Sequence, residues 1–275
     1  MIQQVPSGAT VSRFLLGHRL EQLRSSRHLT LREVAGSLYL SDSKLCRIER
    51  GEHRATVTEI ESLADHYGAC GRTRATMLRW GALSQGRGLY HSFADVADAR
   101  VRDYLDVEPA GLRAVFAPRV IPSVLRTRRY AVEMLGAMRA EEVERRLWLL
   151  ALRQQRLWES GRGPVRVLLA ETVLDLGLGG AAVMGEQTRR LCDVPVQVRV
   201  LPTQQAARVS SGAFSVVDLG EDQVTLAGRE REDGRPRLHP DRQGRAAARF
   251  EELWRAGVDF GGLATVSAAR RSRAA

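Results

Sequence analysis

Apolar and polar residues alternate with a helical period in the first third of the chain. Two short runs lie within residues 31–51, which read LREVAGSLYLSDSKLCRIERG. In the first, Leu31, Val34, Ala35 and Leu38 stand at i, i+3, i+4 and i+7, and in the second Leu45 and Ile48 are the inward apolar positions. Thr30 and Glu33 form a capping-box pattern before the first run. Ser41 can cap the second run, and Gly51 stands where a helix-ending glycine belongs. The pattern predicts two short helices joined by a tight corner.

Three more amphipathic segments surround this pair. Ser12 can cap a helix that runs to about Arg27. A later helix is capped by Thr56 or Thr58 and stopped by Gly68, and another covers residues 73–83. Five short helices of this kind can share one small core, so we expect an all-α unit at the N-terminus.

The remainder of the chain mixes strand and helix patterns. A glycine pair and a polar stretch in residues 84–106 favour a domain boundary near residue 84. Strands are predicted at 165–170, 196–201, 214–219 and 223–226, the last two as a hairpin. Helices are predicted at 123–137, with Pro122 before its first turn, and at 141–158, 181–192 and 241–256.

These patterns give an α+β chain. We expect an all-α domain over residues 1–84, an α/β domain with a small sheet flanked by helices over 85–262, and a basic tail over 263–275.

Charge favours a polyanionic partner. The net charge is +10 and the pI about 10.5, as expected for a nucleic-acid-binding protein. The positive charge is spread along the chain, so composition alone does not locate a site. Three distant cysteines lack metal-ligand spacing with the histidines, which predicts a reduced, cytoplasmic protein without a metal or other cofactor. No leader and no membrane-spanning run is expected.

The outward face of the second short helix has the chemistry of a major-groove reader. Its polar positions are Asp42, Ser43, Lys44, Arg47 and Arg50, while Leu45 and Ile48 point inward. Lys44 is the only lysine beside many arginines, which suggests a selected contact. An ordinary corner between two helices in a helical protein is the alternative interpretation.

Residues 16–68 resemble the lambda-repressor/Cro-like helix-turn-helix of the XRE family. The matching residues are Leu20, Leu23, Arg24, Leu29, Thr30, Val34, Ala35, Leu38, Ser41, Ile48, Glu49, Arg50 and Gly51. The run I-E-R-G is quite specific for that family. The chain departs at the turn position usually held by glycine, which is Tyr39; a left-handed tyrosine costs roughly 1–2 kcal/mol, so a differently shaped corner is expected.

The resemblance implies roles by position. The side chains expected to face base edges are Asp42, Ser43, Lys44 and Arg47. Those expected at phosphates are Thr30, Arg32, Arg50 and Arg54. For Asp42 an equal alternative is stabilisation of the helix dipole.

The second half has a set of family-like residues, which are Ile121 to Thr127, Leu152 to Gln155, Glu171, Gly180, Met184, Gln187, Val200 to Pro202 and Phe214. On these residues it resembles the uncharacterised C-terminal domain fused to XRE helix-turn-helices in actinobacterial regulators, which are likened to antitoxins and often encoded beside a small partner protein. Ser123, Arg126 and residues 224–228 depart from the pattern, which leaves the partner or ligand open.

Three functions follow from these features. The first is a nucleoid-associated transcription regulator that binds a near-palindromic operator as a homodimer and does not act as an enzyme. Its C-terminal domain would mediate dimerisation and the response to a partner protein or ligand. The second is an enzyme with Glu171, Asp175 and Asp218 as acid or base groups, against which a structural pair of Glu171 with an arginine such as Arg153 is favoured. The third is an antitoxin-like module whose residues Arg126, Arg128 and Arg129 bind an acidic protein, although a run of exposed arginines is more often an ordinary solvated face. Arg126, Arg153 and Glu171 are thus the candidate ligand or partner residues.

Overall fold

The computed structural model describes residues 8–161, 164–209, 212–220, 224–230 and 236–261. Its N-terminal part consists of the helices α1 (Ala9–Ser26), α2 (Leu31–Ser37), α3 (Asp42–Glu49), α4 (Val57–His66) and α5 (Gly71–Ser84). These five predicted helices are all present. The predicted basic tail lies outside the described residues, and no described helix is long and apolar enough to cross a bilayer.

Most of the predicted helix ends are confirmed. Thr30 and Thr56 each form a complete capping box, and the Ser41 hydroxyl accepts from the Lys44 N–H at 3.2 Å. The first helix begins earlier than predicted, because Gly8 is its N-cap and the N–H of Ser12 already donates to the Gly8 carbonyl. Ser12 is buried inside the first turn and is not a cap.

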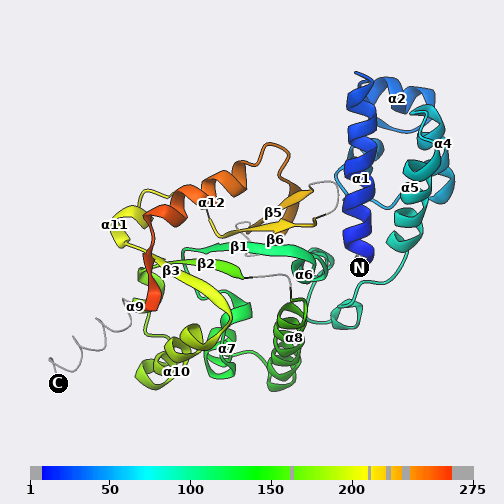
Figure 1. Ribbon diagram of the computed structural model, residues 1–275. Helices are drawn as coiled ribbons and strands as arrows, with labels where there is room; N and C mark the ends of the chain where they lie inside the picture. Colours follow the sequence, from blue (N-terminus) through cyan, green and yellow to red (C-terminus); the bar gives the residue numbers. More distant parts are fainter. Residues whose placement is uncertain (1–7, 162–163, 210–211, 221–223, 231–235, 262–275) are drawn as a thin grey trace.

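Beyond α5 the chain forms a seven-stranded mixed sheet with helices on both faces (Figure 1). Its strands are β1 (Leu112–Ala117), β2 (Val165–Ala170), β3 (Val196–Leu201), β4 (Phe214–Asp218), β5 (Thr225–Glu230), β6 (Pro236–Pro240) and β7 (Val258–Asp259). Their order is β6-β5-β4-β1-β2-β3-β7. The adjacent strands β1, β2 and β3 are parallel, and the other neighbouring strands pair antiparallel.

Helices cover the two faces unequally. The helix α12 (Arg245–Ala256) packs on one face, where Phe250 and Trp254 join Phe116 and Phe214 in an aromatic cluster. The opposite face carries α6 (Ala99–Gly111), α7 (Arg128–Leu135), α8 (Ala140–Glu159) and α10 (Gly180–Asp193). Short elements complete the fold: η1 (His91–Phe93), η2 (Ser123–Leu125), α9 (Thr172–Asp175) and α11 (Thr203–Ala206).

Several of these elements differ from the sequence-based predictions. No element was predicted at α6, at the central strand β1, or at β6 and β7. The helix predicted over 123–137 is two elements, because Arg126 is extended and the Thr127 hydroxyl caps α7 by accepting from the Tyr130 N–H. The strand predicted at 223–226 runs instead as β5, and Gln223 lies outside the described residues. The helix predicted from residue 241 begins at Arg245, because Asp241 caps it from outside.

The helical part and the sheet part meet through α1 and α6. The hydroxyl of Thr10 donates to both Asp103 and Asp106, and Arg13 forms a 2.7 Å ion pair with Asp103. Their buried apolar residues form one continuous cluster. The predicted boundary near residue 84 remains a prediction.

Candidate nucleic-acid interface

The second helix of the corner, α3, is fixed from behind by the helical core. Leu45 and Ile48 are 0% and 1% exposed, as predicted. A Cβ at Gly17 would lie 2.5 Å from the Ile48 carbonyl oxygen, so this glycine permits the close approach of α1 to α3. The apolar side of α3 is therefore locked, and its polar side is turned outward.

A buried ion pair fixes the end of α3. The Arg24 guanidinium donates to both carboxylate oxygens of Glu49, at 2.7 and 2.8 Å, and to the Leu29 carbonyl at 2.9 Å. The two side chains are 14% and 3% exposed. In the sequence, Arg24 and Glu49 were noted only as residues that match the XRE family. Their contact joins α1, the α1–α2 connection and α3.

The predicted base-reading residues differ in how accessible they are. Asp42, Ser43 and Arg47 are exposed on α3. Lys44 is half-buried and paired with Glu59 at the start of α4. Although burial acts to raise it, the pKa of Glu59 is lowered by the hydrogen bonds from Lys44 and from the Thr56 N–H. Lys44 is therefore held by a firmly ionised carboxylate on the neighbouring helix.

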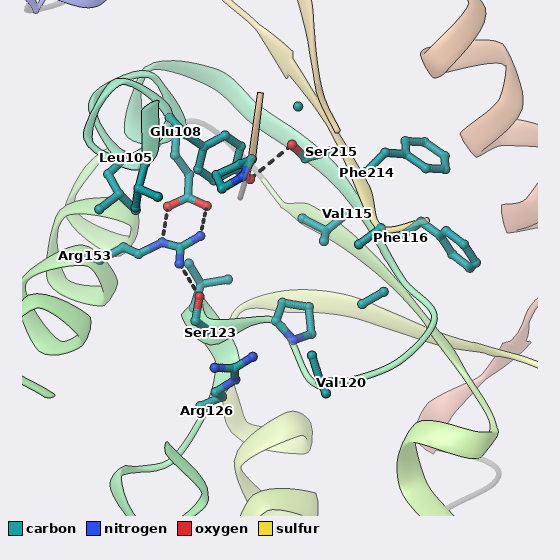
Figure 2. Close-up of a pocket in the computed structure, with 18 residues that line it drawn as sticks. Leu105, Glu108, Val115, Phe116, Val120, Ser123, Arg126, Arg153, Phe214 and Ser215 are labelled. Carbon is teal, nitrogen blue, oxygen red and sulfur yellow. Dashed lines mark hydrogen bonds and ion pairs between the residues drawn. The ribbon is translucent and has the colours of Figure 1, made fainter. Parts of the chain in front are cut away.

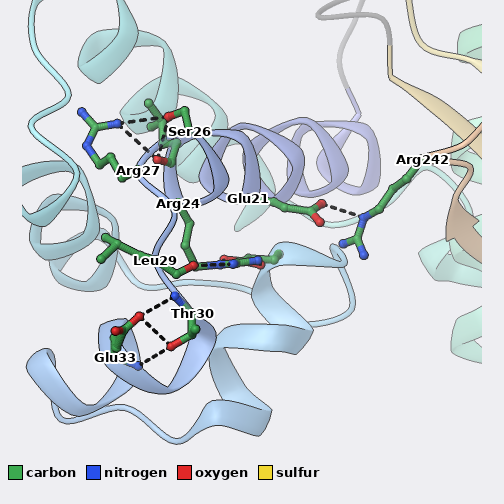
Figure 3. Close-up of polar contacts among 10 residues, drawn as sticks. Glu21, Arg24, Ser26, Arg27, Leu29, Thr30, Glu33 and Arg242 are labelled. Atoms are coloured by element: carbon green, nitrogen blue, oxygen red, sulfur yellow. Dashed lines mark hydrogen bonds and ion pairs between the residues drawn. The ribbon is translucent and has the colours of Figure 1, made fainter.

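The predicted phosphate residues are all exposed, but two of them have partners within the protein. The Thr30 N–H and hydroxyl both donate to Glu33, which lowers the pKa of that carboxyl and places a negative charge at the start of α2 (Figure 3). Arg54 donates to the Gln85 and Gly86 carbonyls after α5. Arg32 lies in the first turn of α2, and Arg50 is the C-cap of α3.

The corner between α2 and α3 has the left-handed backbone conformation that glycine usually provides in this family. Tyr39 has a φ of +56° and its side chain is 97% exposed. The differently shaped corner expected from this tyrosine is wrong, because the Leu40 N–H bonds back to the Ala35 carbonyl and fixes the turn. The surrounding turn therefore tolerates the backbone strain of a tyrosine in the left-handed conformation.

The sheet part touches the helical part beside the end of α3. Arg237 on β6 pairs with Glu52 at 3.1 Å, and Arg242 pairs with Glu21 at 2.7 Å (Figure 3). Arg47 lines a small cavity between the two parts there. The N-terminal half of α3, which enters the groove in this class of domain, has no hydrogen bond or ion pair to a described residue of the sheet part.

The candidate ligand residues fall into two places. Arg126 and Arg153 line one cavity beneath β1, where Arg153 pairs with Glu108 (Figure 2). Glu171 lies after β2, where the Thr203 N–H and hydroxyl donate to it and lower its pKa. The expected pairing of Glu171 with Arg153 is therefore wrong, since Arg153 is taken by Glu108.

Two of the three carboxylates considered for catalysis, Glu171 and Asp218, lie far apart, while Asp175 ends α9 soon after Glu171. Glu171 follows the C-terminal end of β2, whereas Asp218 ends β4 beside the start of β1, at the other end of the sheet. Asp218 lies 3.7 Å from Arg113. The arginine cluster is likewise dispersed, because Arg128 pairs with Glu144 and Arg129 with Glu186. No group of three or more potential metal ligands was found in the described residues.

Comparison with known families agrees with this architecture. Residues 15–77 match a helix-turn-helix domain, and residues 101–259, more than half of the chain, match the domain of unknown function DUF5753. The chain belongs to the DUF5753 family. The XRE-like helix-turn-helix predicted from the sequence is confirmed, which makes this a DNA-binding protein of the regulator type. No curated protein and no solved structure matches the chain.

Proposed function

We propose that this DUF5753 protein is a sequence-specific transcription regulator that inserts α3 into the major groove of DNA. The observation that carries this proposal is the two-sided arrangement of α3. Leu45 and Ile48 are fully buried, and Asp42, Ser43 and Arg47 are presented together to solvent. A short helix fixed in this way can bring side chains to base edges without losing its position.

Arg47 and Asp42 are the sharpest base readers in this proposal. A guanidinium suits guanine O6 and N7, and a carboxylate accepts from cytosine N4. Arg32 and Arg50 border the same face and serve as phosphate contacts, which set register rather than sequence. Lys44 reads a base only when it leaves Glu59.

The protein acts as a dimer in this proposal. One small helix-turn-helix makes few contacts, and two copies on successive major grooves, about 34–36 Å apart, supply the specificity that one lacks. The sheet part then acts by binding and not by catalysis. Support comes from Glu171 and Asp218, which lie at opposite ends of the sheet.

Selection from a pool of random duplexes by the purified full-length chain tests this function. Enrichment of an inverted repeat with half-sites about one helical turn apart supports it. Enrichment of no sequence, or binding that ignores sequence at every salt concentration, contradicts it.

A further inference from the structure

The edge of the sheet next to the helical part carries two opposed arginines. This edge consists of β5 and β6, which lie beside the N-terminal helices in Figure 1. Arg229 on β5 stands directly opposite Arg237 on β6. Like charges in this position destabilise a sheet. Arg229 is exposed, and no described residue forms a hydrogen bond or ion pair with its side chain, so nothing described relieves the repulsion on the β5 side.

These arginines adjoin the end of α3. Arg237 pairs at 3.1 Å with Glu52, which comes two residues after Arg50, the C-cap of α3. Burial, and then Arg237, lower the pKa of His239 on the same face of β6. Arg229 and Arg50 act in the same direction, so both lie within electrostatic reach of this one imidazole. The cations of the sheet edge therefore continue from Arg50, a proposed phosphate contact.

A cavity of about 220 Å³ joins this edge to the polar face of α3. Four elements each contribute one arginine to its lining, namely Arg13 of α1, Arg47 of α3, Arg100 of α6 and Arg237 of β6. Asp103 pairs with Arg13 and Glu52 with Arg237. Neither Arg47 nor Arg100 has a carboxylate partner among the described residues. Two guanidinium groups thus stand open where the two parts of the protein meet.

Arg100 is placed against the ordinary charge preference of a helix. It lies in the first turn of α6, where the partial positive charge of the helix N-terminus disfavours a cation. Its side chain is exposed and shares the cavity with Arg237, the partner of Arg229 across the strands. Two unfavourable arrangements therefore meet around Arg237. Proteins break local rules of this kind mainly at functional sites.

We propose that Arg100, Arg229 and Arg237 bind the sugar-phosphate backbone of the DNA whose groove receives α3. The inference rests on the proposed function, because α3 brings the duplex to this edge. Backbone contacts of this kind fix the position of the protein on the duplex without reading its sequence. The sheet part therefore touches DNA directly and adds affinity to the helix-turn-helix.

A duplex suits this surface better than a compact anion. The three arginines come from α6, β5 and β6, and they extend a border that already includes Arg47 and Arg50 of α3. Each DNA strand presents a phosphate charge about every 3.4 Å along the axis, so one backbone can meet cations that are spread over several elements.

Binding of the full-length chain to a labelled duplex of random sequence, measured by fluorescence anisotropy at several salt concentrations, tests this surface. Arg229→Gln should reduce the slope of log affinity against log salt by about one, which corresponds to one lost phosphate contact. Arg100→Gln should do the same. The matched control is Arg156→Gln, an exposed arginine of α8 on the opposite face of the sheet that has no ion pair to a described residue. Its slope should equal that of the wild type.

Urea denaturation separates this role from a structural one. Arg229→Gln and Arg100→Gln each remove an unfavourable charge arrangement, so their urea midpoints should equal or exceed that of the wild type. A wild-type salt slope in Arg229→Gln, or an equal loss of slope in Arg156→Gln, overturns the proposal. If Arg229→Gln does not fold, Arg100→Gln decides by the same criteria.

The wild-type chain distinguishes failure of this inference from failure of the proposed function. If it binds no duplex, both fail. If it selects a motif but Arg229→Gln keeps the wild-type slope, only the contact from the sheet edge fails. If it selects no motif but the slope falls in Arg229→Gln, sequence recognition fails and the backbone contact stands.

Discussion

Arg24 and Glu49 form a two-point ion pair that joins α1 to the last residue of α3. The pair is almost fully buried, and its arginine also satisfies the Leu29 carbonyl, so three segments of the helical part meet at one guanidinium. Hydrogen bonding to Glu49 raises the pKa of Arg24 against the opposing effect of its burial. The orientation of α3 thus depends on a buried contact behind its exposed polar face.

Removing one partner of this pair leaves a buried charge uncompensated. Glu49→Gln should lower the free energy of unfolding by about 3–5 kcal/mol. Asp65→Asn breaks the exposed pair with Arg74 in the same helical part and should cost about 0–1 kcal/mol. Urea denaturation of both variants measures the difference. Equal small losses would show that the Arg24–Glu49 pair does not hold α3.

The left-handed conformation of Tyr39 should lower the stability of the protein by a measurable amount. Tyr39→Gly should stabilise the protein by about 0.5–1 kcal/mol, because glycine relieves the left-handed strain and the exposed ring loses no packing. Ser37→Gly, in the helical backbone of α2 nearby, should instead destabilise by about 0.5–1 kcal/mol. A loss of stability in Tyr39→Gly would mean that the ring makes a contact of its own in solution.

The pair between Lys44 and Glu59 should restrain DNA binding. Glu59→Gln keeps the cap of α4, since glutamine also serves in a capping box, but it releases Lys44. DNA affinity should rise by about 0.5–1 kcal/mol in fluorescence anisotropy. Glu61→Gln makes the same charge change on α4 without contacting Lys44 in the described structure. An equal rise in both variants would attribute the effect to net charge.

Acidification should weaken the fold through His239. Burial, and then the neighbouring Arg237, lower the pKa of His239 below its ordinary value of 6.5. When the pKa of a histidine is lower in the folded than in the unfolded protein, its contribution to stability is complete above the unfolded pKa. This contribution is lost as the pH falls from the unfolded pKa through the folded pKa. Urea midpoints should therefore drop between about pH 7.5 and about pH 5.5, and less so in His239→Gln. An identical drop in both proteins would exclude His239 as the cause.

Local sequence signals were enough to predict the helical part. Thr30, Ser41 and Thr56 are caps whose partners stand three residues away, so the helix starts could be read directly. Leu45 and Ile48 follow from helical periodicity, and their burial is confirmed. The base and phosphate roles of the α3 face remain predictions.

Residues whose partners lie far away in the sequence account for most of what could not be predicted. In α6, the polar residues Asp106 and Glu108 are buried. Their hydrogen-bond partners, Thr10 and Arg153, lie far away in the sequence. The stretch therefore read as a polar connection. Lys44 seemed open to DNA because its carboxylate partner, Glu59, lies on another helix, 15 residues further along the chain. Thr127 was a readable signal for the break before α7, but the apolar positions on both sides masked it.

The base specificity of Arg47 is the most direct test of the DNA-binding account. Duplex selection with Arg47→Ala should return the wild-type motif with one position relaxed, at a cost of about 1–3 kcal/mol. Arg50→Ala should instead weaken binding to all sequences and reduce the salt dependence by about one phosphate. A motif left intact at every position by Arg47→Ala would contradict insertion of α3 into the groove.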